Sequence, residues 1–270
     1  MKDVRDLGRK LMYADPHIFG LLECKGVIQH FISQTTAPLS YTFILKCPDS
    51  MSQPKSLREL LLSPSCNVSL SDRLKLAKDL TKSVSYIHTF GFVHKNITPE
   101  NILIFNDEKS RSQSAFLVGF GCMRGVDRGT IRQGDLAWGR NLYRHPLRQG
   151  QKPEEDYIMQ HDIYSLGVCL LELGLGQSFL SYNNGEADPH PAETVRAVID
   201  EASQQQPGRT KEHLVSLART RLPIWAGRKF SAIVETCLTC LDANNKDFGD
   251  EHEFEDEDGI LVGVRYIKKV

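Results

Sequence analysis

The feature that most restricts the fold of this chain is a stretch near its middle that is apolar almost all round a helix. Residues 161–176 read HDIYSLGVCLLELGLG, and their only acidic side chains are those of Asp162 and Glu172. A helix without a polar face has to be covered by other elements on every side. The stretch is also too short for a membrane span, which needs about 20 apolar residues. It therefore predicts a globular domain built round one central helix.

The length and charge of the chain fit such a domain. A chain of 270 residues can bury a large core, either as one domain or as two lobes. Its 33 basic and 34 acidic residues give a net charge of −1. Because no large excess of either sign is present, we expect neither a nucleic-acid partner nor an anionic membrane surface.

The cysteines and the first residues indicate a cytoplasmic protein. Seven cysteines are scattered along the chain, and an odd, irregularly spaced set does not form a disulfide framework. The first residues, MKDVRDLGRKL, are charged and contain no apolar signal core. We therefore expect a reducing intracellular compartment.

Hydrophobic periodicity predicts mixed secondary structure in the first part of the chain. Leu7 and Leu11 share one face of a helix expected over residues 3–13. A capping pattern at Ser69 and Asp72 opens a second helix, expected to end near Gly91. Between these helices we expect strands at Phe19–Ile28 and Tyr41–Leu45, then a Pro- and Ser-rich linker over residues 48–56 that marks a lobe boundary.

The second part of the chain predicts two strands followed by helices. The strands are expected at NILIF (101–105) and AFLVGF (115–120), and residues 121–160 show no periodicity and predict an irregular loop. Beyond the central helix, helices are expected over Ala192–Ser203 and Phe230–Leu241. Residues 247–258 predict an acidic loop, and ILVGVRYIKKV (260–270) begins another apolar segment.

The stretch VHKNITPENILIF, residues 93–105, carries the functional signal. Its frame is a His, a polar residue two positions later, then Pro-Glu-Asn and an apolar run. This frame resembles the catalytic loop of protein kinases, H-R-D-x-x-x-x-N, in which the Asp is the catalytic base and the Asn holds a metal ion. In this chain Asn96 stands at the base position and Asn101 at the metal position.

Other landmarks follow in the order of a kinase. Gly119-Phe120-Gly121 stands where kinases carry Asp-Phe-Gly, LYRHPLRQ resembles the end of an activation segment, and Asp162 matches the aspartate that anchors the catalytic loop. The amino-acid sequences of these motifs are similar to those of kinase-like domains of filamentous fungi, of the kind found beside HeLo-type prion-inhibition domains. The resemblance implies an α+β, protein-kinase-like fold over residues 1–270.

The resemblance also implies an incomplete N-lobe. A kinase N-lobe begins with a Gly-rich loop and a Val-Ala-Ile-Lys strand, and neither precedes the helix expected at residues 3–13. We therefore expect a truncated N-lobe at 1–48, with one helix and about two strands, and a mainly helical C-lobe at 49–270. A sheet with an open edge attracts other chains, so self-association through the N-lobe is expected.

The substitutions in the motifs predict impaired catalysis. Asn96 cannot accept a proton as a carboxylate does, Gly119 offers no metal ligand, and Asn101 alone is a weak metal site. The resemblance thus favours a pseudokinase, a signalling module that binds protein partners and uses neither ATP nor Mg²⁺. The alternative is an active ATP-dependent kinase with atypical residues, acting on proteins or on small molecules, which would bind both.

The remaining candidates have mainly structural interpretations. The resemblance assigns His94 and Phe120 to the apolar spine between the lobes and Asp162 to support of the loop. Lys95 is either a solvated side chain or a partner for a phosphate on the activation-like loop, for example at Thr130. Cys237 and Cys240 form a C-x-x-C, but zinc needs four ligands, so core packing or free thiols are expected.

Overall fold

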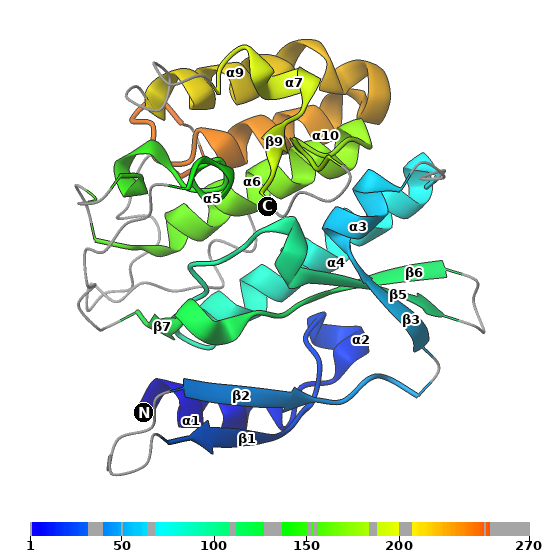
Figure 1. Cartoon of the computed structure of the whole chain (residues 1–270), viewed down its shortest axis with the longest axis vertical. Helices are drawn as coiled ribbons and strands as arrows, with labels where there is room; N and C mark the ends of the chain where they lie inside the picture. Colours follow the sequence, from blue (N-terminus) through cyan, green and yellow to red (C-terminus); the bar gives the residue numbers. More distant parts are fainter. Residues whose placement is uncertain are drawn as a thin grey trace.

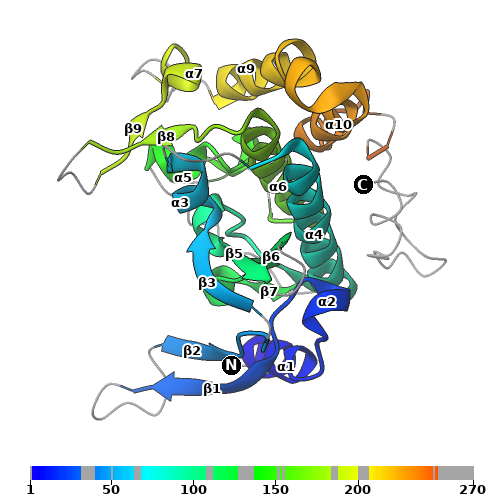
Figure 2. The same cartoon turned by 90° about the vertical axis from the view of Figure 1, so that its right-hand side faces the viewer.

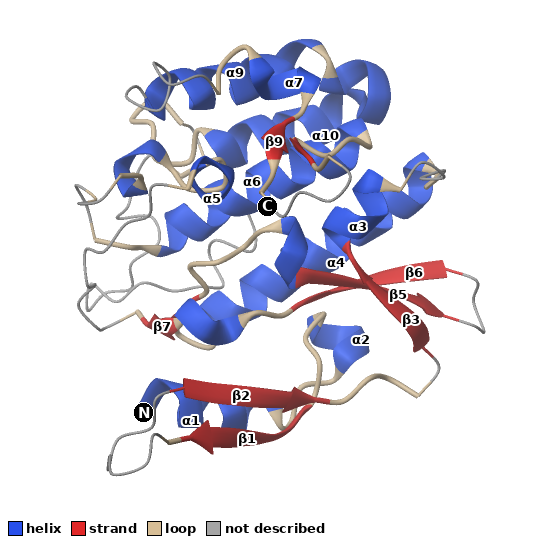
Figure 3. Ribbon diagram, in the orientation of Figure 1, coloured by secondary structure: helices blue, strands red, loops and turns tan. Residues whose placement is uncertain are grey.

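The computed structural model shows a small N-terminal unit and a larger helical unit, with a three-stranded sheet between them (Figures 1 and 3). It describes residues 2–31, 40–49, 51–63, 68–107, 112–126, 137–150, 153, 156–183, 188–199, 207–245 and 247–248. The mixture of helices and strands confirms the α+β expectation. No helix in these ranges is both long enough and apolar enough to cross a membrane.

The N-terminal unit consists of two helices and a hairpin. These elements are α1 (Lys2–Leu11), α2 (Pro16–Phe19), β1 (Cys24–His30) and β2 (Ser40–Leu45). Leu7 and Leu11 of α1 are fully buried, as their shared face predicts. β1 and β2 pair antiparallel with Val27 opposite Phe43, and both of these side chains pack against the core.

The prediction of a strand from Phe19 was wrong at its start. The Asp15 side chain accepts a hydrogen bond from the backbone N–H of His17, and Pro16 stands in the first turn, so residues 16–19 form α2. Gly20 ends this helix with a left-handed φ of 65°. A cap followed by proline was the signal for a helix start, and the apolar residues that follow it concealed that signal.

The middle sheet has the strand order β3-β5-β6, and all its pairs are antiparallel. Its strands are β3 (Met51–Ser56), β5 (Ile102–Asp107) and β6 (Ser112–Leu117). Strands β5 and β6 are the two expected after the loop. β3 lies in the segment expected to be a linker. It forms a strand because the chain there runs along the open edge of β5, opposite β6, and pairs with it.

The helical unit surrounds α6 (Met159–Leu175), whose seventeen residues are all buried as predicted. The other helices in the described ranges are α3 (Leu57–Leu62), α4 (Leu70–Thr89), α5 (Trp138–Asn141), α7 (Glu193–Arg196), α9 (Pro207–Thr220) and α10 (Leu222–Leu238). Figure 2 shows α4, α6 and α10 together on one side of the molecule, with α4 and α10 both packed against α6.

Several helix boundaries differ from the sequence expectation. α10 begins eight residues before the predicted Phe230 and contains a bend at Gly227, where φ is 82°. The helix predicted over Ala192–Ser203 is only the four-residue α7, and its predicted end lies outside the described residues. α3 and α9 were missed. α3 is a single short run of leucines, and Ser56 and Glu59 form its capping box.

Short elements connect these parts. They are the strands β4 (Phe92–Val93), β7 (Arg124–Gly125), β8 (Leu180–Ser181) and β9 (His190–Pro191), and the 3-10 turns η1 (Pro99–Asn101), η2 (Phe120–Cys122) and η3 (Pro146–Arg148). The region 121–160, expected to be irregular, therefore contains α5, β7 and η3 among its described residues. Thr130, most of the acidic run 247–258 and the segment 260–270 lie outside the described residues.

Candidate functional site

The loop that carries the functional signal lies between α4 and β5. It leaves α4 through β4, whose Phe92 and Val93 pair with Gly125 and Arg124 of β7. It then turns through η1 into β5. Because helix, strand pairs and turn hold both ends, the segment from His94 to Asn101 is fixed to the core at each side.

The side chain of Asp162, on α6, holds the start of this loop. Its carboxylate accepts hydrogen bonds from the backbone N–H groups of His94 (2.7 Å) and Lys95 (2.9 Å). The Tyr157 hydroxyl donates to the same carboxylate at 2.7 Å, and His88 Nε2 lies 3.1 Å from it. Asp162 is fully buried, so these partners replace its water completely.

The partners of Asp162 keep it ionised. Burial acts to raise the pKa of this carboxyl, but the hydrogen bonds from His88 and from the His94 amide outweigh burial, and the pKa lies below its usual value. Burial lowers the pKa of His94, so its ring is neutral, and its Nε2 lies 3.0 Å from the carbonyl oxygen of Val118. The ionised Asp162 carboxylate and the neutral His94 ring thus each hold the loop through hydrogen bonds.

His94 and Phe120 lie against one another, as the resemblance implies. Their ring centroids are 5.4 Å apart at an interplanar angle of 66°. The Phe43 ring of β2 follows, with its centroid 5.8 Å from that of Phe120. The column of three rings connects the loop to the N-terminal hairpin, and Phe43 was not singled out by the sequence.

Asn96 and Asn101 face each other across the loop. The Asn101 Nδ2 donates to the carbonyl oxygen of Asn96 at 3.0 Å and lies 3.4 Å from Thr98 Oγ1. The backbone N–H of Asn96 points at His94 Nδ1, 3.3 Å away. The side-chain NH₂ group of Asn101 therefore hydrogen-bonds within the loop itself, which stabilises the turn.

Gly119 packs directly on the side chain of Asn101. A Cβ atom added at Gly119 would lie 2.3 Å from Asn101 Oδ1 and 2.5 Å from its Cγ. The φ of Gly119 is 83°, a left-handed conformation that residues with a Cβ adopt only at a cost. The place where a carboxylate would stand is thus filled by the Asn101 amide, and any side chain there requires Asn101 to move.

Metal-binding groups are sparse near the loop. Within the described ranges, no group of three or more His, Cys, Asp or Glu side chains is placed to hold an ion. Asn101 Oδ1 is the neutral ligand that the resemblance assigns to a metal. Magnesium is normally bound by one or two carboxylates besides phosphate oxygens, so the described residues of this loop provide a poor site.

Lys95 belongs to a cluster of three basic side chains round Tyr157. Lys95 Nζ and the Arg148 guanidinium each lie 5.6 Å from the centroid of the Tyr157 ring, and Arg124 donates to the Tyr157 carbonyl oxygen. Burial, followed by the charges of Arg124 and Arg148, lowers the pKa of Lys95. Lys95 is thus no isolated surface lysine. The acceptor suggested for it, Thr130, lies outside the described residues.

A buried ion network next to the loop was not foreseen. Arg58 of α3 binds Glu172 of α6 at 2.7 Å and Glu100 of η1 at 2.9 Å, and it also donates to the Tyr143 hydroxyl. Tyr143 donates to the second oxygen of Glu172 at 2.8 Å. Burial raises the pKa of Glu172, and Arg58 opposes that rise. The sequence signals for the network were Arg58 within the leucine-rich segment LRELLL and Glu172 within the apolar run 161–176.

The C-x-x-C pair is part of the core, as expected. Cys237 and Cys240 are both buried, and Cys240 Sγ donates to the carbonyl oxygen of Gln160 at 3.2 Å. Burial raises the pKa of Cys237 to about 12. The six described cysteines are all free thiols.

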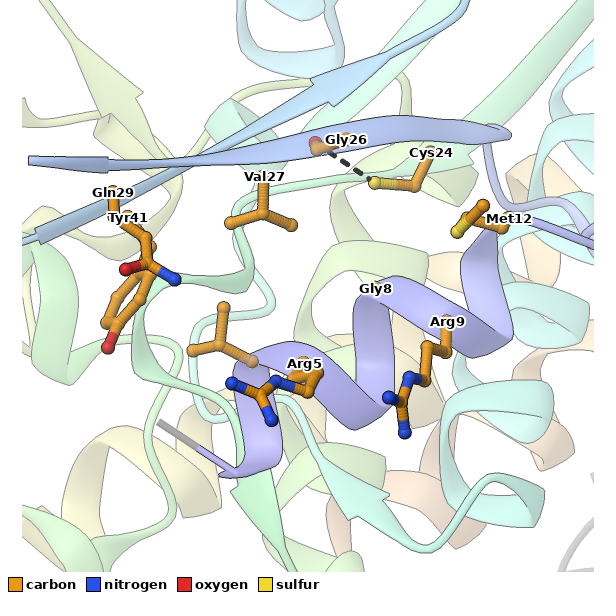
Figure 4. A pocket seen from close by; sticks show the side chains of 10 residues that line it. Arg5, Gly8, Arg9, Met12, Cys24, Gly26, Val27, Gln29 and Tyr41 are labelled. Carbon is orange, nitrogen blue, oxygen red and sulfur yellow. Dashed lines mark hydrogen bonds between the residues drawn. The ribbon is translucent and has the colours of Figure 1, made fainter.

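A pocket of ≈ 240 Å³ lies between α1 and the hairpin, and it contains none of the loop residues (Figure 4). Val4, Gly8 and Met12 of α1 form one wall, and Cys24, Gly26 and Val27 of β1 form the other. The exposed side chains of Arg5 and Arg9 stand at its rim (Figure 4). Since Leu7 and Leu11 face the opposite way into the core, this pocket is separate from the loop site.

Comparison with known proteins gives one consistent family. The family described as protein kinase domain matches residues 12–240. A probable LIM domain-containing serine/threonine-protein kinase of Dictyostelium discoideum is 29% identical over 119 residues, which are 44% of this chain and 17% of that protein.

Two further relatives have similar coverage. Serine/threonine-protein kinase mos of Patiria pectinifera is 27% identical over 124 residues, 44% of this chain and 33% of that protein. Dual specificity testis-specific protein kinase 2 of Mus musculus is 31% identical over 118 residues, 43% of this chain and 20% of that protein. The matched regions thus span 17% to 33% of these three relatives.

Proposed function

The chain belongs to the protein kinase domain family, and from this premise we propose that it is a binding or signalling module whose phosphoryl transfer is impaired. The observation that carries the proposal is the packing of Gly119 against Asn101, because it fills the place of the metal-binding carboxylate. Phosphoryl transfer depends on metal ions that neutralise the developing charge on the phosphate. A neutral amide packed on glycine does not supply that environment.

The base position supports the same proposal. Asn96 is neutral, and its carbonyl oxygen is held by the Asn101 amide at 3.0 Å. Losing a general base costs on the order of 10²–10⁴ in rate. Loss of the base and loss of a metal carboxylate act on the same transition state, so the remaining parts recover little of it.

The contacts round the loop are those that a binding surface needs. Asp162 tethers the loop, the column of His94, Phe120 and Phe43 joins the two units, and Arg58 ties α3 to α6. In the proposed module these interactions serve to stabilise a shape. We propose that a protein partner binds this surface. The six described free cysteines fit a reducing cytoplasm.

The open hairpin is a second place for protein contacts. β2 contains no charged residue and no proline, two of the features that protect a sheet edge. Ile28 and Ile44 are 49% and 42% exposed on the hairpin. We include self-association through this edge in the proposal.

Radiolabelled phosphate transfer from ATP tests the proposal. The parent and the double variant Asn96→Asp/Gly119→Asp are each assayed with Mg²⁺, for labelling of themselves and of a generic protein substrate. We expect both to stay at background, because Asn101 obstructs position 119 and the other phosphate-ordering groups are not restored. Labelling by the double variant clearly above the parent would show that a working nucleotide site exists.

A thermal melt with and without ATP and Mg²⁺ tests nucleotide binding separately. A ligand at a hundred times its Kd stabilises the folded state by about 2.7 kcal/mol. We expect no rise in Tm at millimolar ATP, with ATP plus a chelator as the control. A reproducible rise that needs Mg²⁺ would support the alternative of an active ATP-dependent kinase.

A further inference from the structure

The corner between α9 and α10 exposes two large apolar side chains next to each other. Ile224 is 81% exposed and Trp225 is 49% exposed. Of the large apolar side chains in the described ranges, only that of Tyr13 is more exposed, at 85%, and Asp15 follows it two residues later. Single apolar residues are normal on a protein surface, whereas adjacent ones at one exposed turn indicate a contact surface.

The packing of α10 keeps these two side chains on the outer face of the corner. Leu222 is fully buried and Ala226 is 8% exposed, so the inner face of this turn is closed by the core. Leu222 packs on Gly174 of α6, where an added Cβ atom would lie 2.6 Å from the Leu222 side chain. α9 and α10 lie at the end of the molecule opposite the N-terminal unit (Figures 1 and 2). Ile224 and Trp225 are thus held outward at this end.

The chain on both sides of the corner is basic. Residues 213–234 contain four Lys and Arg side chains and no Asp or Glu. One of the four, Arg219, forms an ion pair at 2.7 Å with a glutamate of α10. Arg221, Arg228 and Lys229 are exposed and have no acidic partner within the part of the chain that the structure describes. Three cations without counter-charges therefore flank the two apolar side chains.

This combination of charge and apolar surface suits an anionic lipid bilayer. Trp is enriched at the boundary between lipid head groups and acyl chains, because its ring is apolar and its N–H is polar. Each Lys or Arg close to an anionic leaflet strengthens binding about fivefold. A protein partner would need a pocket shaped for the protruding side chains, whereas a bilayer receives them without one. Charge complementarity and the exposed position therefore favour a lipid surface over an acidic protein.

We propose that the α9–α10 corner binds peripherally to membranes that contain anionic lipids. Ile224 and Trp225 enter the layer below the head groups, and the three flanking cations contact the anionic head groups. Two side chains and three charges give weak and reversible binding. The net charge of −1, from which we expected no anionic membrane surface, averages over the whole chain and does not describe this corner. The inference goes beyond the proposed function and uses no residue of the loop.

Co-sedimentation of the full chain with lipid vesicles tests the binding. Vesicles of phosphatidylserine and phosphatidylcholine are compared with vesicles of phosphatidylcholine alone. We expect a partition coefficient about tenfold or more higher on the anionic vesicles, and salt should reduce it. Ile224→Ser/Trp225→Ser should lower it about tenfold or more. Met12→Ser/Tyr13→Ser is the matched control, because it also removes one aliphatic and one aromatic side chain, 48% and 85% exposed, and it should leave binding unchanged.

A charge variant distinguishes contact at the corner from attraction of the whole molecule. Arg228→Glu/Lys229→Glu should weaken binding to the anionic vesicles by about fivefold or more for each residue. Arg5→Glu/Arg9→Glu on α1 makes the same change in net charge at two other exposed positions and should have much less effect. Equal losses in the two variants would contradict a contact at the corner.

Tryptophan fluorescence locates the contact and keeps the test valid if one variant does not fold. The emission of the parent should shift to shorter wavelength on anionic vesicles, and Trp225→Phe, which retains the partly buried Trp138, should show no shift. The proposal is overturned if the parent binds neither kind of vesicle, binds both equally, or keeps its binding in Ile224→Ser/Trp225→Ser. Binding of polyglutamate but not of vesicles would assign the corner to an acidic protein partner instead.

Discussion

The N-terminal hairpin and the central helix α6 differ in how completely neighbouring elements bury and hold their residues. All seventeen residues of α6 are buried, and its Asp162 and Glu172 are each held by several partners. In β2, exposed and half-buried residues alternate, and among the described strands it pairs with β1 alone. A two-stranded unit is marginally stable unless another element covers it. Here α1 covers the hairpin through β1, and Phe43 of β2 contacts Phe120 next to the loop. Changes round α6 should therefore act on stability, and changes in the hairpin on association.

Asp162→Asn should produce the largest loss of stability. The amide cannot accept all the hydrogen bonds that the carboxylate receives from His94, Lys95 and Tyr157, and its NH₂ group would face donors. Breaking a buried, fully paired charge costs about 3–5 kcal/mol. Urea denaturation measures the free energy of unfolding. Asp49→Asn, at an exposed position, is the control, and an equal loss in both would contradict the role given to Asp162.

Gly119→Ala should have the next largest effect. The left-handed φ and the contact with Asn101 together should cost about 1–3 kcal/mol. Gly121, two residues later, has open space where its Cβ would lie and no positive φ, so Gly121→Ala should be close to neutral. Thermal denaturation of both variants checks the contrast. Similar Tm values would show that Asn101 gives way easily.

Acid should weaken the helical unit through its buried histidines. Burial lowers the pKa of His145 to about 3 and that of His161 to about 4, so both are neutral in the folded state and titrate near 6.5 when unfolded. The unfolded state binds more protons below pH 6.5, and stability is full above that pH and falls as pH decreases towards 4. The loss is at most about 1.4 kcal/mol per pH unit for each histidine.

His145→Asn isolates one of these contributions. The asparagine oxygen can replace His145 Nδ1 as the acceptor for the N–H of Leu147, which is 3.4 Å away, and it does not titrate. The variant should therefore show a shallower decrease in the free energy of unfolding between pH 6.5 and 5. His17→Asn, at an exposed position, serves as the control. An unchanged slope in His145→Asn would remove His145 from this explanation.

The smallest effect on stability is expected for Ile44→Lys. The position is exposed on β2, so the free energy of unfolding should change by less than about 0.5 kcal/mol. A charge on a strand edge opposes pairing with another chain, so self-association at tens of micromolar should decrease. Light scattering of the parent, this variant and Ile224→Lys on α10 measures it. A parent that stays monomeric would disprove the association itself.

The sequence predicted the elements whose signals are local and strong. The apolar run of α6, the stripe and cap of α4, and the strands β5 and β6 were all expected. His94 contacts Phe120, and Asp162 accepts hydrogen bonds from the backbone N–H groups of His94 and Lys95; these are arrangements that the motif resemblance implies. In each case one segment, or one motif with fixed spacing, carries the information.

The remaining features depend on contacts between distant segments. β3 is polar and contains Pro54, so nothing in it predicts a strand, and its pairing with β5 creates one. The packing of Gly119 on Asn101 depends on how two loops meet. The column reaches Phe43 only because the hairpin folds onto the loop. Patterns within a short window of the sequence cannot predict contacts between segments that are far apart along the chain.

The Arg58 network has a consequence for the rates of folding and unfolding. Its bonds join residues 42, 85 and 114 positions apart, to Glu100, Tyr143 and Glu172. Long loops must close before such bonds can form, so we expect them to form late in folding, after the transition state. Interactions absent from the transition state slow unfolding without changing the folding rate. We therefore expect a φ-value near zero at Arg58 in a chevron analysis, which would make this network a kinetic lock on the native state.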